Sequence, residues 1–298
     1  MELFYKRWFK ILAMPAVILF VMVILIPFII GVTYSFTSWR GTYFSGGENW
    51  WEALVGFDNY IKVFKTEKFM TAFLYTIKFS CIAVVVVNVF SLLLSMMLVK
   101  INKGAGALRA IFYMPNLLGG LALGFIWQFI FQIVYTKFIF GEGGIFPIEA
   151  LTNMTQSSTK AMFALVIVVT WQMAGYMMMI YVNGLNNIPK DLYEAANIDG
   201  ANFFQKFKNI TFPMLMPSFT VVFFLTLSGC FKLLDQNVAL TNGDFGTRML
   251  ALQIVQTTKD VSPPDYGFAQ AQAVIFFVII AAVSLIQVSI MKKKEVEA

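Results

Sequence analysis

Long apolar stretches alternate with shorter polar segments along almost the whole chain. A helix needs about 20 apolar residues to cross a bilayer. Stretches of that length lie at roughly residues 11–34, 73–99, 110–134, 161–183, 211–234 and 267–291. A helix satisfies its own backbone hydrogen bonds in lipid, so the pattern predicts an all-α membrane protein with six transmembrane helices. We expect residues 1–298 to form a single transmembrane domain.

Basic residues predict the orientation of these spans, because cytoplasmic loops carry an excess of Lys and Arg. With six spans, one side holds three Lys or Arg residues in each of the segments 1–10, 100–109, 184–210 and 291–298. On the other side, the segments 34–72, 135–160 and 235–266 hold four, two and two. We therefore expect both termini in the cytoplasm. The first apolar stretch is too long for a signal peptide, so we expect a retained span.

Composition places the chain in the same class. Apolar residues make up 59% of the sequence, charged residues make up 13%, and mean hydropathy is +0.74. The net charge of +6 follows from the basic segments and does not indicate a nucleic-acid partner. The sequence has no histidine, and Cys81 and Cys230 both fall inside predicted spans. We expect neither a metal site nor a disulfide.

The polar segment between the fourth and fifth predicted spans has the features of a short helix. Pro189 suits a first helical position, and Gly200 is a natural stop. Acidic residues near its start suit the positive end of the helix dipole. A second short helix is expected to follow, before Pro213 begins the next apolar run. The residues on one face of the first helix, where small alanines permit close docking, are Leu192, Ala195, Ala196 and Asp199.

Residues 194–217 resemble the signature loop of permease subunits in bacterial binding-protein-dependent ABC importers. The residues that carry this resemblance are Glu194, Ala195, Ala196, Asp199, Gly200, Ala201, Phe207, Ile210, Pro213, Leu215 and Pro217. Phe212 stands where the family usually has leucine. The resemblance implies that the loop 184–210 holds a coupling helix, seated in a cleft of a separate ATPase subunit. From the residues alone, the same helix could instead lie on the lipid surface.

Two further segments resemble the carbohydrate, or maltose-permease-like, subgroup of that family. One covers residues 56–60, where we expect a short amphipathic helix before the second span. The other covers residues 109–131, in which Pro115 could kink the third span. In that span Gly120 and Gly124 form a small-residue pair, which we expect to serve packing within the chain.

Polar side chains inside spans mark a candidate substrate pathway, because they are costly in lipid unless they face protein or water. Tyr176 is the strongest candidate, since its segment is similar to the maltose-permease region whose aromatic contacts sugar. Lys232 and Asp235 can pair on one helical face, although the maltose subunit has an asparagine where this chain has Lys232. Each candidate could instead form a hydrogen bond between helices. The full set is Asn88, Gln128, Trp171, Gln172, Tyr176, Lys232 and Asp235.

The mixture of aromatic and amide side chains suits a neutral polyol, because sugar rings stack on aromatics while amides bind hydroxyl groups. We therefore expect a saccharide substrate, with another neutral solute as the alternative. A secondary transporter is the main competing class. No predicted span has Asp or Glu in its middle, which disfavours proton coupling, whereas sodium coupling stays open.

The sequence lacks the G-x-x-x-x-G-K-[ST] motif that binds nucleotide phosphates, and it lacks the common hydrolase motifs. We expect no catalytic residue and no cofactor in this chain. The resemblance implies that ATP and Mg²⁺ are bound by two copies of a separate ABC ATPase. It also implies a second permease subunit in a heterodimer, an extracellular solute-binding protein, and a place in the bacterial plasma membrane.

Overall fold

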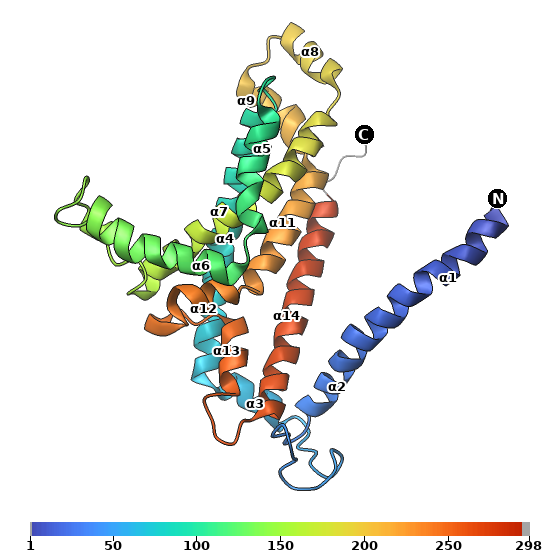
Figure 1. The fold of residues 1–298 in the computed structure, drawn as a ribbon. Helices are drawn as coiled ribbons and strands as arrows, with labels where there is room; N and C mark the ends of the chain where they lie inside the picture. The colour runs from blue at the N-terminus through green and yellow to red at the C-terminus, as the bar shows by residue number, and fades with distance from the viewer. Residues whose placement is uncertain (1, 294–298) are drawn as a thin grey trace. The chain divides into compact units, whose positions relative to one another are not determined.

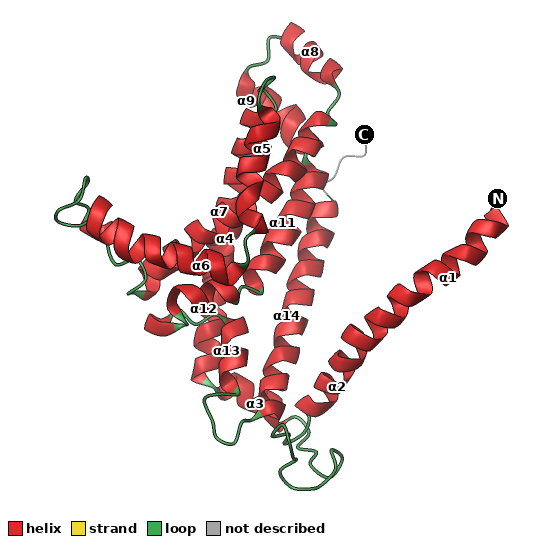
Figure 2. Ribbon diagram, viewed as in Figure 1, coloured by secondary structure: helices red, strands yellow, loops and turns green. Residues whose placement is uncertain are grey.

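The computed structural model describes residues 2–293, and almost all of its regular structure is helical. Figure 2 shows helices joined by loops; the described residues form three isolated β-bridges between residues 37 and 54 and no named strand. Contacts divide the chain into two compact units, Met1–Phe69 with Ile254–Val278 and Met70–Gln253 with Ile279–Ala298. The single domain over residues 1–298 stays a prediction.

Within residues 2–293, five helical segments are long and apolar enough to cross a membrane, or six if one bent pair is a single span. Each overlaps one predicted span, so the all-α fold and, with the bent pair as one span, the number of spans are confirmed (Figure 1). The five are Ala13–Ser35, Glu67–Leu98, Gly120–Ile139, Ser158–Asn186 and Tyr266–Lys292, and the bent pair is Phe203–Met214 with Met216–Phe231.

The first unit contains the N-terminal helices. Helix α1 (Glu2–Phe20) continues through a π-helical turn into α2 (Ile26–Ser35), and α3 (Asp58–Lys65) follows after a long loop. The buried Asn59 amide donates hydrogen bonds of 2.9 Å to the carbonyl oxygens of Ser35 and Thr37. These bonds hold α3 against the end of α2. The short helix expected near residues 56–60 is therefore confirmed.

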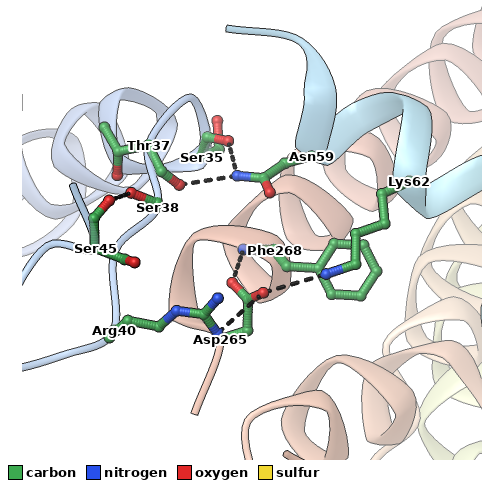
Figure 3. A network of polar contacts seen from close by, with 9 residues as sticks. All are labelled: Ser35, Thr37, Ser38, Arg40, Ser45, Asn59, Lys62, Asp265 and Phe268. Atoms are coloured by element: carbon green, nitrogen blue, oxygen red, sulfur yellow. Dashed lines mark hydrogen bonds and ion pairs between the residues drawn. The ribbon is translucent and has the colours of Figure 1, made fainter. Parts of the chain in front are cut away.

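Asp265 joins this loop to the start of α14 (Tyr266–Lys292) in the same unit. One of its carboxylate oxygens accepts the Phe268 backbone N–H at 3.0 Å, which caps the helix. The other oxygen lies 3.2 Å from the Arg40 guanidinium and 3.3 Å from the Lys62 ammonium (Figure 3). The Asp265 side chain is only 8% exposed, so both cations compensate a carboxylate that has left water.

Helix α7 (Ser158–Asn186) is the best-buried span of the second unit. Its N-cap Ser157 accepts the Lys160 backbone N–H at 3.2 Å. Gly175 lets α7 approach α5 (Ala105–Tyr113) at backbone contact, because a Cβ atom there would overlap the Phe112 carbonyl group. Gly184 lets α7 approach the Ser218 side chain of α11 (Met216–Phe231), because a Cβ atom there would overlap the Ser218 hydroxyl group.

The third predicted span, 110–134, is wrong as a continuous helix. Helix α5 ends at Tyr113, a 3-10 turn covers Met114–Leu117, and α6 (Gly120–Phe129) starts afresh and continues as a π-helix to Ile139. Pro115 explains the interruption, because it lacks an N–H and its ring collides with the preceding turn. After the break, α6 runs across the direction of α7 (Figure 1).

Helix α12 (Asp235–Thr241) packs on α6 through the two small residues that the sequence singled out. A Cβ atom on Gly124 would lie 2.6 Å from the Ala239 Cβ, and one on Gly120 would lie 2.7 Å from the Asp235 Cβ. The expected role of the glycine pair in packing within the chain is therefore confirmed.

Candidate functional site

The loop 184–210 contains the predicted short helix, α8 (Lys190–Ile198), at the opposite end of the second unit from α12 (Figure 1). Pro189 immediately precedes the first helical residue instead of occupying it. Gly200 ends the helix with φ +72°, a left-handed conformation that suits glycine. The Gly200 N–H binds the Asn197 carbonyl at 3.1 Å, and the Ala201 N–H binds the Ala196 carbonyl at 2.9 Å. These two bonds form a Schellman motif, which satisfies the last carbonyls of α8.

The second predicted helix begins as α9 (Phe203–Lys206), with Asn202 and Gln205 in a reciprocal capping box. It continues through a π-helical turn at Phe207–Thr211 into α10 (Phe212–Met214), and the chain then bends by 70° into α11. Pro217 explains the bend, because it cannot donate the helical hydrogen bond to the carbonyl four residues earlier. The loop and the fifth span are therefore one continuous helical path with a corner.

Two polar contacts bind α8 to this path. The Tyr193 and Thr211 hydroxyl groups lie 2.8 Å apart. The Lys206 ammonium donates to the Asn197 side-chain oxygen at 2.7 Å. The inner face of α8 is thus defined by Tyr193 and Asn197, which lie one helical turn apart.

The other face of α8 has no such contact within the described chain. Leu192 is 41% exposed and Ile198 is 88% exposed, which is unusual for apolar side chains on a short helix. Of the residues predicted to couple to an ATPase, Ala196, Ala201, Phe207 and Pro213 are half-buried, and Glu194, Ala195, Asp199 and Gly200 are exposed. The structure therefore leaves the predicted docking face of α8 available to another surface.

Three of the predicted pathway residues lie on one stretch of α7. Trp171 is 41% exposed, and its ring packs edge-on against Trp127 of α6 at 5.6 Å. Tyr176 is 37% exposed, and its ring packs edge-on against Tyr113 at 6.3 Å. Between them in sequence, Gln172 accepts a 2.6 Å hydrogen bond from Gln236.

The break in the third span brings a backbone group to the same place. Gln172 donates a hydrogen bond of 3.4 Å to the Leu118 carbonyl, which lies between the 3-10 turn and α6. The Trp127 and Trp171 rings, the two amides and the Leu118 carbonyl thus meet where α6, α7 and α12 converge, whereas the Tyr176 ring lies against Tyr113 at the end of α5. Gln236, Tyr113 and Leu118 were missed by sequence reasoning, because the break and the start of α12 were not foreseen.

The remaining predicted pathway residues occupy different surroundings. Gln128 donates to the Leu240 carbonyl at 3.3 Å and so joins α6 to α12. Asn88 lies buried in α4 (Glu67–Leu98), where it accepts the Tyr181 hydroxyl at 2.8 Å and donates to the Val84 carbonyl at 2.7 Å. Both side chains thus form hydrogen bonds between helices, which is the alternative role that the sequence left open.

The expected pairing of Lys232 with Asp235 on one helical face is wrong. Helix α11 ends at Phe231, and α12 starts at Asp235, so no helix carries both residues. Both side chains are exposed, and the ion pairs of the described residues do not include one between them. The fifth span accordingly ends before residue 234.

Comparison with known proteins identifies the family of this chain. Residues 88–295 match the family described as "Binding-protein-dependent transport system inner membrane component". The chain belongs to this family. Among curated proteins, it is 40% identical to the probable starch degradation products transport system permease protein AmyD of Thermoanaerobacterium thermosulfurigenes, covering 99% of this chain and 98% of AmyD. It is 31% identical to the multiple sugar-binding transport system permease protein MsmF of Streptococcus mutans, covering 98% and 97% of the two chains.

The permease also shares its fold with a solved structure. It matches a chain of a bacterial ABC transporter involved in the import of the acidic polysaccharide alginate, with a TM-score of 0.76 and 19% identity. The match covers 98% of the permease and 99% of that chain. The permease is therefore a multi-pass inner-membrane component of an ABC importer, and the fold expected from the sequence is confirmed. The residues proposed for coupling and for the pathway stay predictions.

Proposed function

We propose that the permease forms half of the translocation pathway of an ATP-driven saccharide importer. The observation that carries this proposal is the exposed face of α8, which stands away from the spans yet is fastened to the fifth span through Tyr193 and Thr211. Such a helix can receive a movement from outside the membrane and transmit it to a span. Two relatives, AmyD and MsmF, carry starch degradation products and multiple sugars in their names, which supports a saccharide as the substrate.

The convergence of α6, α7 and α12 supports the same substrate class. The Trp171 ring at this convergence and the Tyr176 ring beside the end of α5 are partly exposed, so their faces can stack on the apolar face of a sugar ring. The amides of Gln172 and Gln236 can exchange their mutual hydrogen bond for bonds to sugar hydroxyl groups. Asp235 and Lys232 add exposed polar groups near the start of α12. Another neutral solute of similar size is the alternative substrate.

The energy for transport comes from partners. This sequence contains no nucleotide-binding motif. Membership of the binding-protein-dependent transport family supports the proposal that two copies of a separate ABC ATPase bind ATP and Mg²⁺ and hydrolyse the ATP. A second permease subunit completes the pathway as a heterodimer, and an extracellular solute-binding protein delivers the saccharide. Both termini and the loop 184–210 lie in the cytoplasm.

The mechanism is alternating access. ATP binding closes the ATPase dimer and moves α8, which is held in its cleft through Glu194, Ala195 and Asp199. The movement passes through the Tyr193–Thr211 bond and α9 into α11, and the spans change from inward-open to outward-open. The binding protein then releases its saccharide towards Trp171 and Tyr176.

The test is uptake by the complete transporter in proteoliposomes, with labelled maltooligosaccharides supplied on the loaded binding protein. We expect uptake that requires ATP on the side of α8 and that is unchanged when a sodium gradient is removed. Uptake driven by sodium without ATP would overturn the proposal in favour of secondary transport. Crosslinking of a Glu194→Cys variant to the ATPase tests whether α8 contacts that subunit. Lys78→Cys on α4, which is also exposed, is the control and should not crosslink.

A further inference from the structure

A cavity of about 250 Å³ lies where the ends of α4 and α7 meet α8 and α9. Three apolar residues line the cavity from the span ends, and we call them its floor: Met96, Val99 and Leu185. These residues stand at the ends of two spans, because α4 ends at Leu98 and α7 ends at Asn186. The floor therefore lies at the level where the hydrocarbon core gives way to the lipid headgroups.

The charged residues in the cavity lining, Lys100 and Lys206, are both basic. Lys100 follows the end of α4, and its ammonium lies 5.6 Å from the centroid of the Phe203 ring. Lys206 lies on α9, where its ammonium gives one hydrogen bond to Asn197 and retains two further donors. No acidic residue lines the cavity in the described structure. The acids of α8, Asp191, Glu194 and Asp199, are all exposed.

The two halves of the cavity select the class of ligand. A fully polar ion would have to shed water against the apolar floor, which is unfavourable. A neutral acyl chain would leave the two ammonium groups without a counter-charge. A ligand that combines an anionic group with an acyl chain satisfies both halves, and basic pockets between helices at a membrane surface are of this type.

We propose that this cavity binds an anionic phospholipid, with its phosphate between Lys100 and Lys206 and the start of one acyl chain on Met96, Val99 and Leu185. Tyr193 also lines the cavity, and its bond to Thr211 holds α8 to the helical path. The lipid therefore lies beside Tyr193 and influences how firmly α8 is held to the helical path. The site is defined by the span ends and does not depend on the substrate.

The test uses the full chain in nanodiscs of phosphatidylcholine with increasing phosphatidylglycerol. Native mass spectrometry measures the lipid retained, and the thermal unfolding midpoint measures its effect on stability. We expect selective retention of phosphatidylglycerol and a higher midpoint. The double variant Lys100→Gln/Lys206→Gln should lose about fivefold in apparent affinity for each lysine removed.

The matched control is Lys103→Gln/Lys208→Gln, which removes the same charge from two exposed lysines outside the cavity. It should bind like the unaltered chain. Equal losses in both double variants would mean that only the overall charge matters, and would overturn the proposal. A second variant, Val99→Trp, fills the floor without changing charge and should also weaken binding, so the site can be tested even if the lysine variant is unstable.

Two further measurements identify the ligand, one with inorganic phosphate and one comparing two phospholipids. Inorganic phosphate alone should neither raise the midpoint nor displace the lipid. If phosphate stabilises the chain as much as phosphatidylglycerol does, the cavity is a simple anion site and the proposal fails. Equal retention of phosphatidylcholine and phosphatidylglycerol would also overturn it.

Discussion

The hydroxyl groups of Tyr193 and Thr211 lie 2.8 Å apart, and their hydrogen bond joins α8 to the helix that leads into the fifth span. Thr211 is buried, and within residues 2–293 its hydroxyl makes one other hydrogen bond, a long one of 3.4 Å to the Lys206 carbonyl. If α8 transmits movement, this bond is one of the two polar contacts through which the movement passes.

Tyr193→Phe should loosen that connection without affecting insertion of the spans. The lost bond is worth about 1 kcal/mol, too little to unfold the chain but enough to raise the number of ATP molecules hydrolysed per saccharide imported. The ratio is measured in proteoliposomes. Tyr43→Phe, at an exposed position outside the loop, should leave it unchanged. The same ratio in Tyr193→Phe as in the unaltered protein would remove this bond from the coupling path.

Gly200→Val should disrupt the end of α8 through the backbone alone. A Cβ atom at this position would meet nothing within 4 Å, but φ is +72°, and a left-handed conformation costs an ordinary residue about 1–2 kcal/mol. We expect uptake to fall and ATPase docking to weaken, measured by co-purification. Gly200→Asn is the control, because asparagine tolerates this conformation. A valine variant with normal uptake would contradict the assigned role.

Gly175→Ala should strongly destabilise the packing of α5 on α7. The added methyl group would overlap the Phe112 carbonyl, and both partners are backbone, so neither can move aside cheaply. We expect a loss of about 1–3 kcal/mol, typical of an overpacked core, seen as a lower thermal midpoint. Gly106→Ala on α5 has open space around its Cβ and should be neutral or slightly stabilising. Equal midpoints for the two variants would contradict the close approach.

The sequence contained enough information for the spans and the loop, but not for the breaks between them. Long apolar runs predict spans wherever they occur, and Gly200 predicts the end of α8 because its conformation is local. Pro115 signalled a kink, yet whether a proline bends or ends a helix depends on the neighbouring helices. The end of α11 at Phe231 carries no local signal either. The contact of Gln172 with Gln236, and the cavity beside Lys100 and Lys206, depend on these breaks and on tertiary packing.

Tyr176→Ala should weaken transport while leaving the ATPase assembled. The ring is partly exposed and packs edge-on against Tyr113, so its removal takes away a stacking surface without opening a sealed core. We expect a higher half-saturating concentration of saccharide in proteoliposome uptake, and Tyr176→Phe should retain most of the affinity. Unchanged uptake in the alanine variant would remove Tyr176 from the pathway.

Asp265→Asn should destabilise the first unit by about 1–2 kcal/mol. Asparagine still caps α14, so the change isolates the charge that Arg40 and Lys62 share. The value is below that of a fully buried pair because Lys62 is 56% exposed. Asp260→Asn, which alters a pair with the 64% exposed Lys68, should cost less than about 1 kcal/mol. Thermal midpoints compare the two, and equal shifts would argue against the special role of Asp265.

The 70° bend between α10 and α11 determines how a force on α10 would move the part of the fifth span that lies in the membrane. A straight rod driven from one end would slide along its axis, dragging apolar side chains towards water. A bent helix instead converts a sideways movement of α10 into a tilt of α11. If α8 transmits movement as proposed, the bend lets the fifth span tilt at nearly constant depth, so the bilayer need not deform during each transport cycle.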